Sequence, residues 1–307
     1  MADPDDARQF KLAVAALVAG AIGIGFAPIF VRVSEIGPSA TAFWRMALAL
    51  PLLMLWMRLE PRGKAQYRPA RSLRDHGALA LGGLFFAGDL AAWHWSIKLT
   101  TVANATLFVN MAPVIVAAAS FVLFGERFRS LFLVGLGLAI TGAVMLMGRN
   151  LGEGGGRLTG DGLSLLAALF YAGYIMSIGR LRASFSTATV MGWTAFWTAA
   201  ALLPIAWISG ESLLPVSVQG WGILIGLAII SHVVGQSLIA YGLAHLPAAF
   251  GAVSLLVQPV VAGLLAWVLF AEALGPLELA GAALILAGIT LARRGVRGKG
   301  PNIKRPV

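Results

Sequence analysis

A carboxylate lies between two aromatic rings on one stripe of the hydrophobic segment at about residues 77–97. Phe85, Asp89 and Trp93 are spaced at i, i+4 and i+8, so a helix places them on one face. The carboxylate would attract an ammonium group, and the rings would add cation–π attraction or stack on an aromatic substrate. His94 lies about 140° around the helix from Asp89 and does not share this face. The stripe predicts a site for an amino group beside an apolar or aromatic group.

Other hydrophobic segments carry polar and aromatic side chains too. Tyr171 and Tyr174 are neighbours at i, i+3 on a helix. A polar group inside a membrane is costly and marks a candidate site. A hydrogen bond between helices explains any one of the polar residues at least as well. The predicted lining of a substrate cavity comprises Phe26, Phe85, Asp89, Trp93, His94, Asn110, Tyr171, Tyr174, His232, Gln236, Ser254 and Gln258.

Prolines inside the hydrophobic segments are candidate hinges. Proline removes a backbone hydrogen bond and bends a helix, which neighbouring helices can compensate. Pro28 closely follows Gly23 and Gly25, and this combination weakens one point of the helix. Pro113 and Pro259 lie near the middle of their segments. The alternative is that these kinks only shape helix packing.

Composition places these segments in a membrane. Hydrophobic residues make up 59% of the 307 positions and charged residues 12%. A soluble domain needs more charge than this, so the chain is predicted to be an all-α polytopic membrane protein. A spanning helix takes about 20 residues. Apolar runs between charged and turn-forming clusters predict ten spans, at about 11–33, 38–57, 77–97, 103–124, 130–148, 161–180, 189–209, 220–241, 250–271 and 276–293.

The sequence gives little support to an enzyme or a channel. The chain has no cysteine, which excludes disulfides and thiolate metal sites. Gly135, Gly137 and Gly142 faintly resemble a dinucleotide loop, but they lie in an apolar span with no preceding strand. Neither His-x-x-x-His nor Glu-x-x-His occurs, and no repeated charged ring suggests an ion pore. We therefore predict no metal, no cofactor and no enzymatic activity.

The net charge of +10 is distributed as in a membrane protein. With a cytoplasmic N-terminus, the inner segments hold 18 Lys and Arg residues and the outer segments hold 4. This bias predicts a multi-pass membrane protein with both termini in the cytoplasm, and it argues against nucleic acid as a partner. The basic loop at about 58–76 could contact anionic lipid, although an orientation signal is sufficient to explain it.

The same hydrophobic passage occurs twice. Ala103–Val144 aligns without gaps with Ala249–Thr290, at a shift of 146 positions. Two five-span repeats are predicted, at 11–149 and 161–294. An odd number of spans turns the second copy upside down, and inverted repeats are typical of secondary transporters.

The repeated passage also carries family motifs. Leu123-Phe-Gly-Glu126 and Leu269-Phe-Ala-Glu272 follow the mid-span prolines, and Phe43-Trp44-Arg45 lies in the second span. The pattern from about 11 to 294 resembles the EamA repeat of the drug/metabolite transporter superfamily. The resemblance implies two inverted five-helix repeats, cytoplasmic termini and alternating access to a central cavity. Within the superfamily, the chain looks most like the bacterial aromatic amino acid exporters of the YddG group, which implies a place in the bacterial inner membrane.

Two features of the motifs have alternative explanations. Glu126 and Glu272 could cap the next helix or take part in gating. Arg45 could snorkel outward, pair with carbonyls or contact the substrate.

The predicted function is export of small amphipathic metabolites, above all aromatic or other large apolar amino acids. Alternatives are a drug or cationic-compound effluxer of the same fold and, in another class, a non-transporting membrane enzyme or scaffold. A complete inverted pair is expected to function as a monomer. Its partners would then be the substrate and membrane lipid.

Overall fold

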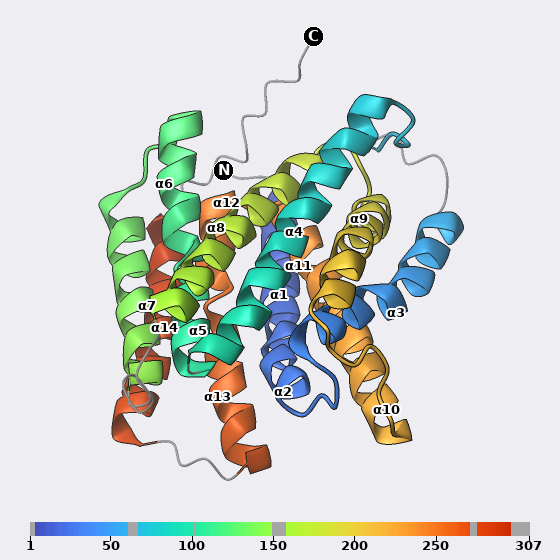
Figure 1. Ribbon diagram of the computed structural model, residues 1–307. Coiled ribbons are helices and arrows are strands. Elements are labelled where there is room, and N and C mark those ends of the chain that lie inside the picture. The colour runs from blue at the N-terminus through green and yellow to red at the C-terminus, as the bar shows by residue number, and fades with distance from the viewer. Residues whose placement is uncertain (1–3, 61–66, 101, 149–157, 271–274, 296–307) are drawn as a thin grey trace.

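Apolar residues dominate every long segment of the chain, and the segments form helices that satisfy their own backbone hydrogen bonds. The computed structural model describes residues 4–60, 67–100, 102–148, 158–270 and 275–295 (Figure 1). All regular structure in these ranges is helical. The helices are α1 Pro4–Gly25, α2 Ala27–Arg32, α3 Pro38–Leu59, α4 Leu73–Leu99, α5 Val102–Val109, α6 Ala112–Phe124, α7 Ser130–Gly148, α8 Leu158–Leu181, α9 Thr187–Ile208, α10 Val218–Gly226, the π-helix η1 Leu227–Gln236, α11 Ser237–Leu243, α12 Ala248–Ser254, α13 Val257–Phe270 and α14 Pro276–Gly295.

These helices account for the ten predicted spans. Within the described ranges, eight segments are long and apolar enough to cross a membrane, and α7 contributes a shorter apolar stretch at Ser130–Leu146. The span formed by α4 is less apolar because it carries Asp89 and His94. Spans one, four, eight and nine are each built from more than one helix. The predicted all-helical architecture with two repeats is confirmed.

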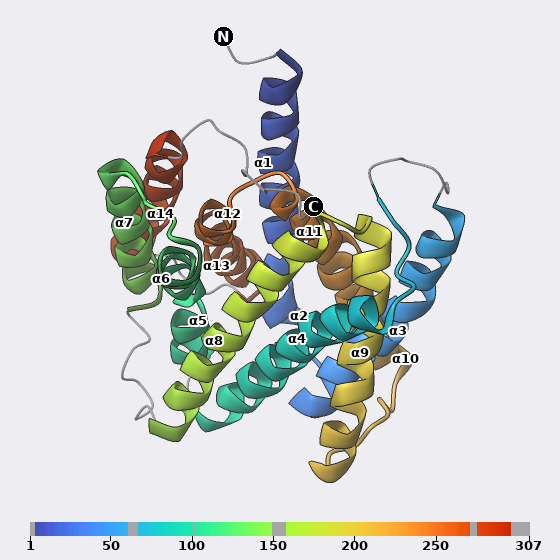
Figure 2. The same ribbon diagram turned by 90° about the horizontal axis from the view of Figure 1, so that it is seen from above.

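Equivalent helices of the two repeats occupy equivalent places. α4 packs on α8, while α1 packs on η1 and α11. Since span one corresponds to span six and span three to span eight, these two contacts are counterparts. α7 and α14 lie side by side at one end of the bundle, and α3 and α9 lie at the other (Figure 1, Figure 2). The crossing helices α4 and α8 lie between the two ends (Figure 2).

The contact between α7 and α14 shows that the repeats are inverted. A Cβ atom at Gly288 would lie 2.6 Å from the Gly135 carbonyl oxygen. One at Gly142 would lie 2.5 Å from the Gly281 carbonyl oxygen. In the repeat, Gly135 corresponds to Gly281 and Gly142 corresponds to Gly288. Gly135 therefore faces the counterpart of Gly142, and Gly142 faces the counterpart of Gly135. Equivalent helices that pair in this way run antiparallel.

Alanine at Gly142 should destabilise the protein, because its methyl group would force the α7 and α14 backbones apart. Overpacking of this kind costs about 1–3 kcal/mol. Gly137 on the same helix is the matched control, since a Cβ atom added there would meet no neighbouring atom within 4 Å. Gly137→Ala should be neutral or stabilising, because alanine favours helix over glycine. Thermal unfolding in detergent measures both variants, and equal losses of stability would contradict the close contact.

Glutamates cap the antiparallel pair of α3 and α9 at both ends. Glu60 follows α3, and its carboxylate accepts a hydrogen bond from Ser186, the N-cap of α9. Glu211 follows α9, and its Oε2 accepts from the backbone N–H groups of Ser39 at 2.9 Å and Ala40 at 3.2 Å. Carboxylates stabilise the unpaired N–H groups at a helix start. Glu211 therefore caps α3 directly, whereas Glu60 binds the hydroxyl of Ser186, whose side chain caps α9 by accepting from the Thr189 N–H group.

Capping was one of two roles that the sequence left open for Glu126 and Glu272. Glu126 lies between α6 and α7, and its side chain accepts no hydrogen bond from the described start of α7. Partial burial raises the pKa of the Glu126 carboxyl, as expected for an acid that lacks a donor. The left-handed Gly125, with φ of 64°, turns the chain here. Glu272 lies outside the described residues.

Candidate functional site

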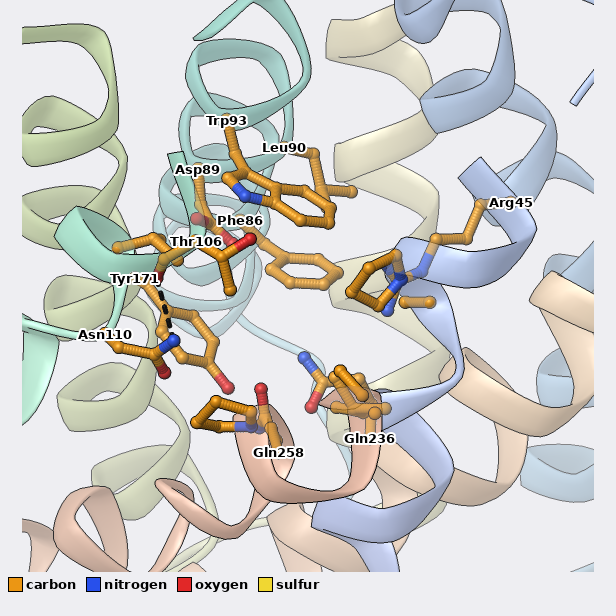
Figure 3. Close-up of a pocket in the computed structure, with 17 residues that line it drawn as sticks. Arg45, Phe86, Asp89, Leu90, Trp93, Thr106, Asn110, Tyr171, Gln236 and Gln258 are labelled. Atoms are coloured by element: carbon orange, nitrogen blue, oxygen red, sulfur yellow. Dashed lines mark hydrogen bonds between the residues drawn. The ribbon is translucent and has the colours of Figure 1, made fainter. Parts of the chain in front are cut away.

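A cavity lies where the interrupted helices meet. It has a volume of about 80 Å³, several times the space that one water needs (Figure 3). Side chains from both repeats contribute to its wall. The lining residues are Ile24, Gly25, Ala27, Pro28, Arg45, Phe86, Asp89, Leu90, Trp93, Thr106, Val109, Asn110, Tyr171, Gln236, Gln258, Pro259 and Ala262.

Glycine and proline break the helices next to the cavity. In span one, helix α1 ends at Gly25, and the next helix, α2, has Pro28 in its first turn. Span four is interrupted between α5 and α6, where Pro113 occupies the first turn of α6. Proline is tolerated there because the first N–H groups of a helix have no partner within it. Span nine breaks at the equivalent place, just before Pro259.

Span eight approaches the cavity as a π-helix. η1 ends at Gln236, whose side chain lines the cavity. It packs closely on α1, where a Cβ atom at Gly20 would lie 2.6 Å from the Gly235 carbonyl oxygen. At ten residues η1 is longer than the single-turn π-bulges that are frequent at functional sites. Span eight thus combines a tight contact on α1 with a polar residue at the cavity wall.

An acidic and a basic side chain face each other across the cavity. Asp89 projects from α4 and Arg45 from α3, on opposite sides of the space (Figure 3). Only 7% of Asp89 and 3% of Arg45 is exposed. Within the described part of the chain, neither side chain has an ion-pair or hydrogen-bond partner, and Arg45 Nε is buried without an acceptor. The Arg45 guanidinium carbon lies 5.8 Å from the centre of the Phe86 ring.

Stacked rings form one side of the site. The Phe86 ring centre lies 4.4 Å from that of Tyr174, with 22° between the ring planes. His232 stacks on Phe86 at 5.6 Å, and Tyr171 lies 6.3 Å from Tyr174. Phe86 and Tyr171 face the cavity, whereas Tyr174 and His232 are buried away from it. This wall can receive an aromatic or large apolar group.

Several polar atoms around the cavity have no hydrogen-bond partner among the described residues. They are Trp93 Nε1, Gln236 Oε1 and Gln258 Nε2. The Tyr171 hydroxyl lies beside the Gln258 amide (Figure 3). Asn110 is satisfied, since its side-chain amide donates to the Thr106 carbonyl oxygen at 2.7 Å. Buried polar groups are normally hydrogen-bonded, so the unsatisfied ones favour a polar ligand.

Six of the twelve predicted lining residues lie at the cavity wall: Asp89, Trp93, Asn110, Tyr171, Gln236 and Gln258. The other six do not line it: Phe26, Phe85, His94, Tyr174, His232 and Ser254. Of the predicted hinges, Pro28 and Pro259 lie at the wall and Pro113 does not.

Local packing explains where these other side chains lie. Phe85 packs on α8, where a Cβ atom at Gly173 would lie 2.7 Å from its ring. His94 Nδ1 lies 2.7 Å from the Pro38 carbonyl oxygen and joins α4 to the start of α3. Ser254 donates to a carbonyl of its own helix at 2.9 Å, and Phe26 lies beside the next turn of its span.

Arg45, Phe86, Leu90 and Thr106 line the cavity but are not among the predicted lining residues, although substrate contact was one of the roles left open for Arg45. The signal for Arg45 was present, because it is the one cation deep inside a predicted span. Phe86 and Asp89 are three residues apart, and residues three apart lie on one helix face just as residues four apart do. The other two residues have no signal of their own in the sequence.

Known proteins resemble both halves of the chain. A sequence profile of the EamA-like transporter family matches residues 11–148 and again 158–294. An uncharacterized transporter from Archaeoglobus fulgidus is 29% identical over 94% of this chain and 98% of its own length. A crystal structure has the same fold, with a TM-score of 0.76 and 20% identity over 93% of this chain and 98% of that chain.

Two further relatives have names that state what they export. The pseudopaline exporter of Pseudomonas aeruginosa is 26% identical over 82% of this chain and 84% of its own length. The probable terminal-alkyne amino-acid exporter of Streptantibioticus cattleyicolor is 28% identical over 76% of this chain and 78% of its own length.

Proposed function

Because the chain belongs to the EamA-like transporter family, we propose that it exports small amphipathic metabolites, above all aromatic or other large apolar amino acids. Family membership makes it a multi-pass membrane transporter and not an enzyme. The observation that carries the substrate class is the cavity itself, where Asp89 lies among apolar and aromatic side chains. Such a wall suits an ammonium group attached to an apolar body.

The relatives support export as the direction of transport. One is named for exporting pseudopaline and another for exporting an amino acid with a terminal alkyne. The likeness of the sequence motifs to the YddG group of aromatic amino acid exporters favours an aromatic side chain on the substrate. The stacked wall around Phe86 and Tyr171 is consistent with this preference.

The inverted repeats support alternating access to this cavity. The helix breaks at Pro28, Pro113 and Pro259 are the proposed hinges, since fewer backbone hydrogen bonds resist bending there. Motion at these points would open the cavity to one side of the membrane at a time. The excess of Lys and Arg in alternate loops supports an inner-membrane orientation with both termini in the cytoplasm. Transport would need a single subunit.

Reconstitution into liposomes tests the function directly. Purified protein should exchange labelled phenylalanine, tryptophan or leucine across the membrane well above protein-free liposomes. Glycine and glutamate should move much more slowly. The proposal fails if no member of a full amino acid panel is transported by protein that remains folded in the liposomes.

A cationic-compound effluxer is the second candidate, because Asp89 and the aromatic wall would also suit a lipophilic cation. The same liposomes can be assayed with an aromatic cation that lacks a carboxylate. Preferential transport of that cation over amino acids would favour this candidate.

Alanine at Trp93 or Tyr171 should weaken transport of aromatic amino acids more than transport of small ones. Each ring lines the cavity, and loss of one aromatic contact costs about 1 kcal/mol, or roughly fivefold in affinity. Phe26→Ala is the control, because this aromatic residue lies in the same region but outside the cavity lining. Concentration-dependent exchange measures the effect. Equal KM values for the three variants and the wild type would contradict the placement of the substrate ring.

A further inference from the structure

The cavity wall carries an acidic and a basic side chain, Asp89 and Arg45, and neither has an ion-pair or hydrogen-bond partner among the described residues. A charge buried inside a membrane protein is costly unless it is paired and hydrogen-bonded. Arg45 and Asp89 lie on opposite walls without an ion pair between them, so ionising both requires an outside partner for each. A bound molecule that places an anionic group at one wall and a cationic group at the other would satisfy both.

We propose that the cavity recognises both ends of a free α-amino acid, with Arg45 binding the carboxylate and Asp89 binding the ammonium group. This inference rests on the proposed function and specifies the substrate at the same site. The guanidinium group offers a planar fork of N–H donors that matches a carboxylate. Asp89 supplies the acceptor for the ammonium group. Arg45 thereby becomes a determinant of specificity, whereas the sequence had left its role open.

The unsatisfied amides strengthen the assignment. Gln258 Nε2 lacks an acceptor and Gln236 Oε1 lacks a donor within the described chain. Both residues line the same space between the two charged walls (Figure 3). A carboxylate accepts hydrogen bonds and an ammonium group donates them, so one zwitterion can complete both amides. The substrate side chain then lies against the rings of Phe86 and Trp93.

Recognition of both ends distinguishes this site from that of a cation effluxer. A molecule that lacks the carboxylate leaves Arg45 without its partner, and one that lacks the ammonium group leaves Asp89 without its partner. Sites built to pair a polar group reject analogues that lack it. Phenylalanine should therefore bind, whereas phenylethylamine, phenylalanine methyl ester and N-acetylphenylalanine should bind poorly.

Binding to the purified full-length protein in detergent, measured by calorimetry, tests the inference with these four compounds. Wild-type protein should bind phenylalanine at least about tenfold more tightly than the methyl ester. Arg45→Gln should abolish that preference by lowering the affinity for phenylalanine, while the affinity for the ester does not fall. Arg45→Lys keeps the charge and should restore part of the preference. The wild-type comparison needs no variant, so it remains decisive if Arg45→Gln does not fold.

The outcomes separate the inference from the proposed function. Equal binding of phenylalanine and its methyl ester to the wild type would overturn recognition of the carboxylate, even if liposomes transport phenylalanine. Arg45-dependent binding of phenylalanine without any transport would support the recognition and overturn the exporter function. Absence of phenylalanine binding to folded wild-type protein would overturn the inference outright.

Discussion

Asparagine at position 89 should reduce phenylalanine transport by about tenfold or more while the protein stays folded. The substitution nearly conserves the shape of the side chain but removes the acceptor charge that we assign to the substrate ammonium group. Hydrogen bonds to charged groups contribute about 1.5–3 kcal/mol, which corresponds to roughly 10- to 150-fold in affinity. Exchange of labelled phenylalanine in liposomes measures the loss. Ser254→Ala is the matched control, since Ser254 is buried but lies outside the cavity lining.

Other results of the same experiment would assign Asp89 a different role. If Asp89 couples transport to protons, Asp89→Asn should abolish the dependence on a pH gradient but spare exchange of substrate. If Asp89→Asn transports at the wild-type level both with and without a pH gradient, Asp89 serves only in helix packing. Loss of exchange in Asp89→Asn together with normal exchange in Ser254→Ala supports binding of the ammonium group.

The repeat was predictable from the sequence because its glycines recur at the same spacing as its apolar residues. Gly135 and Gly142 recur as Gly281 and Gly288, and an odd number of spans then requires inversion. The structure brings these same four residues into backbone contact between α7 and α14. Close helix contacts in a membrane require small residues, so the sequence must record them.

The walls of the cavity were only partly predictable. Asp89 and Gln258 stand out because a polar residue inside an apolar span has few explanations. Whether Phe85 or Phe86 faces the cavity depends on which helix crosses α4. The Phe85 ring packs against α8 at Gly173, so Phe86 is the residue that faces the cavity. Arg45 faces a cavity formed by helices distant in the chain, so its surroundings were not visible from its own span. The π-helical turn of η1 has no distinctive pattern in an apolar run.

A reversible cross-link between positions 35 and 217 should stop transport almost completely. Glu35 follows α2 in the first repeat, and its Oε2 accepts from the backbone N–H groups of Val216 and Ser217 at 3.1 Å each. Its carboxylate also accepts from the hydroxyl of Ser217, the N-cap of α10 in the second repeat. This contact joins the two repeats on one face of the bundle. If the cavity is to open toward that face, the contact must separate.

The contact should be strongest near neutral pH. The Ser217 hydroxyl and the neighbouring backbone donors lower the pKa of the Glu35 carboxyl from its ordinary value of 4.5. A lowered pKa means that the ionised form is favoured in the closed contact. Its stabilisation is therefore complete above about pH 4.5 and is lost as the pH falls through the lowered value. Cross-linking experiments at neutral pH thus start from the formed contact.

The native chain has no cysteine, so Glu35→Cys and Ser217→Cys introduce the only thiols. A short bifunctional thiosulfonate should bridge them and abolish phenylalanine exchange, and reduction should restore that exchange. Each single variant treated with the same reagent controls for modification without a bridge. Mass spectrometry establishes that the bridge has formed. Alternating access predicts that bridged protein retains substrate binding but cannot complete a transport cycle. Full exchange by fully bridged protein would mean that this face of the bundle stays closed throughout transport.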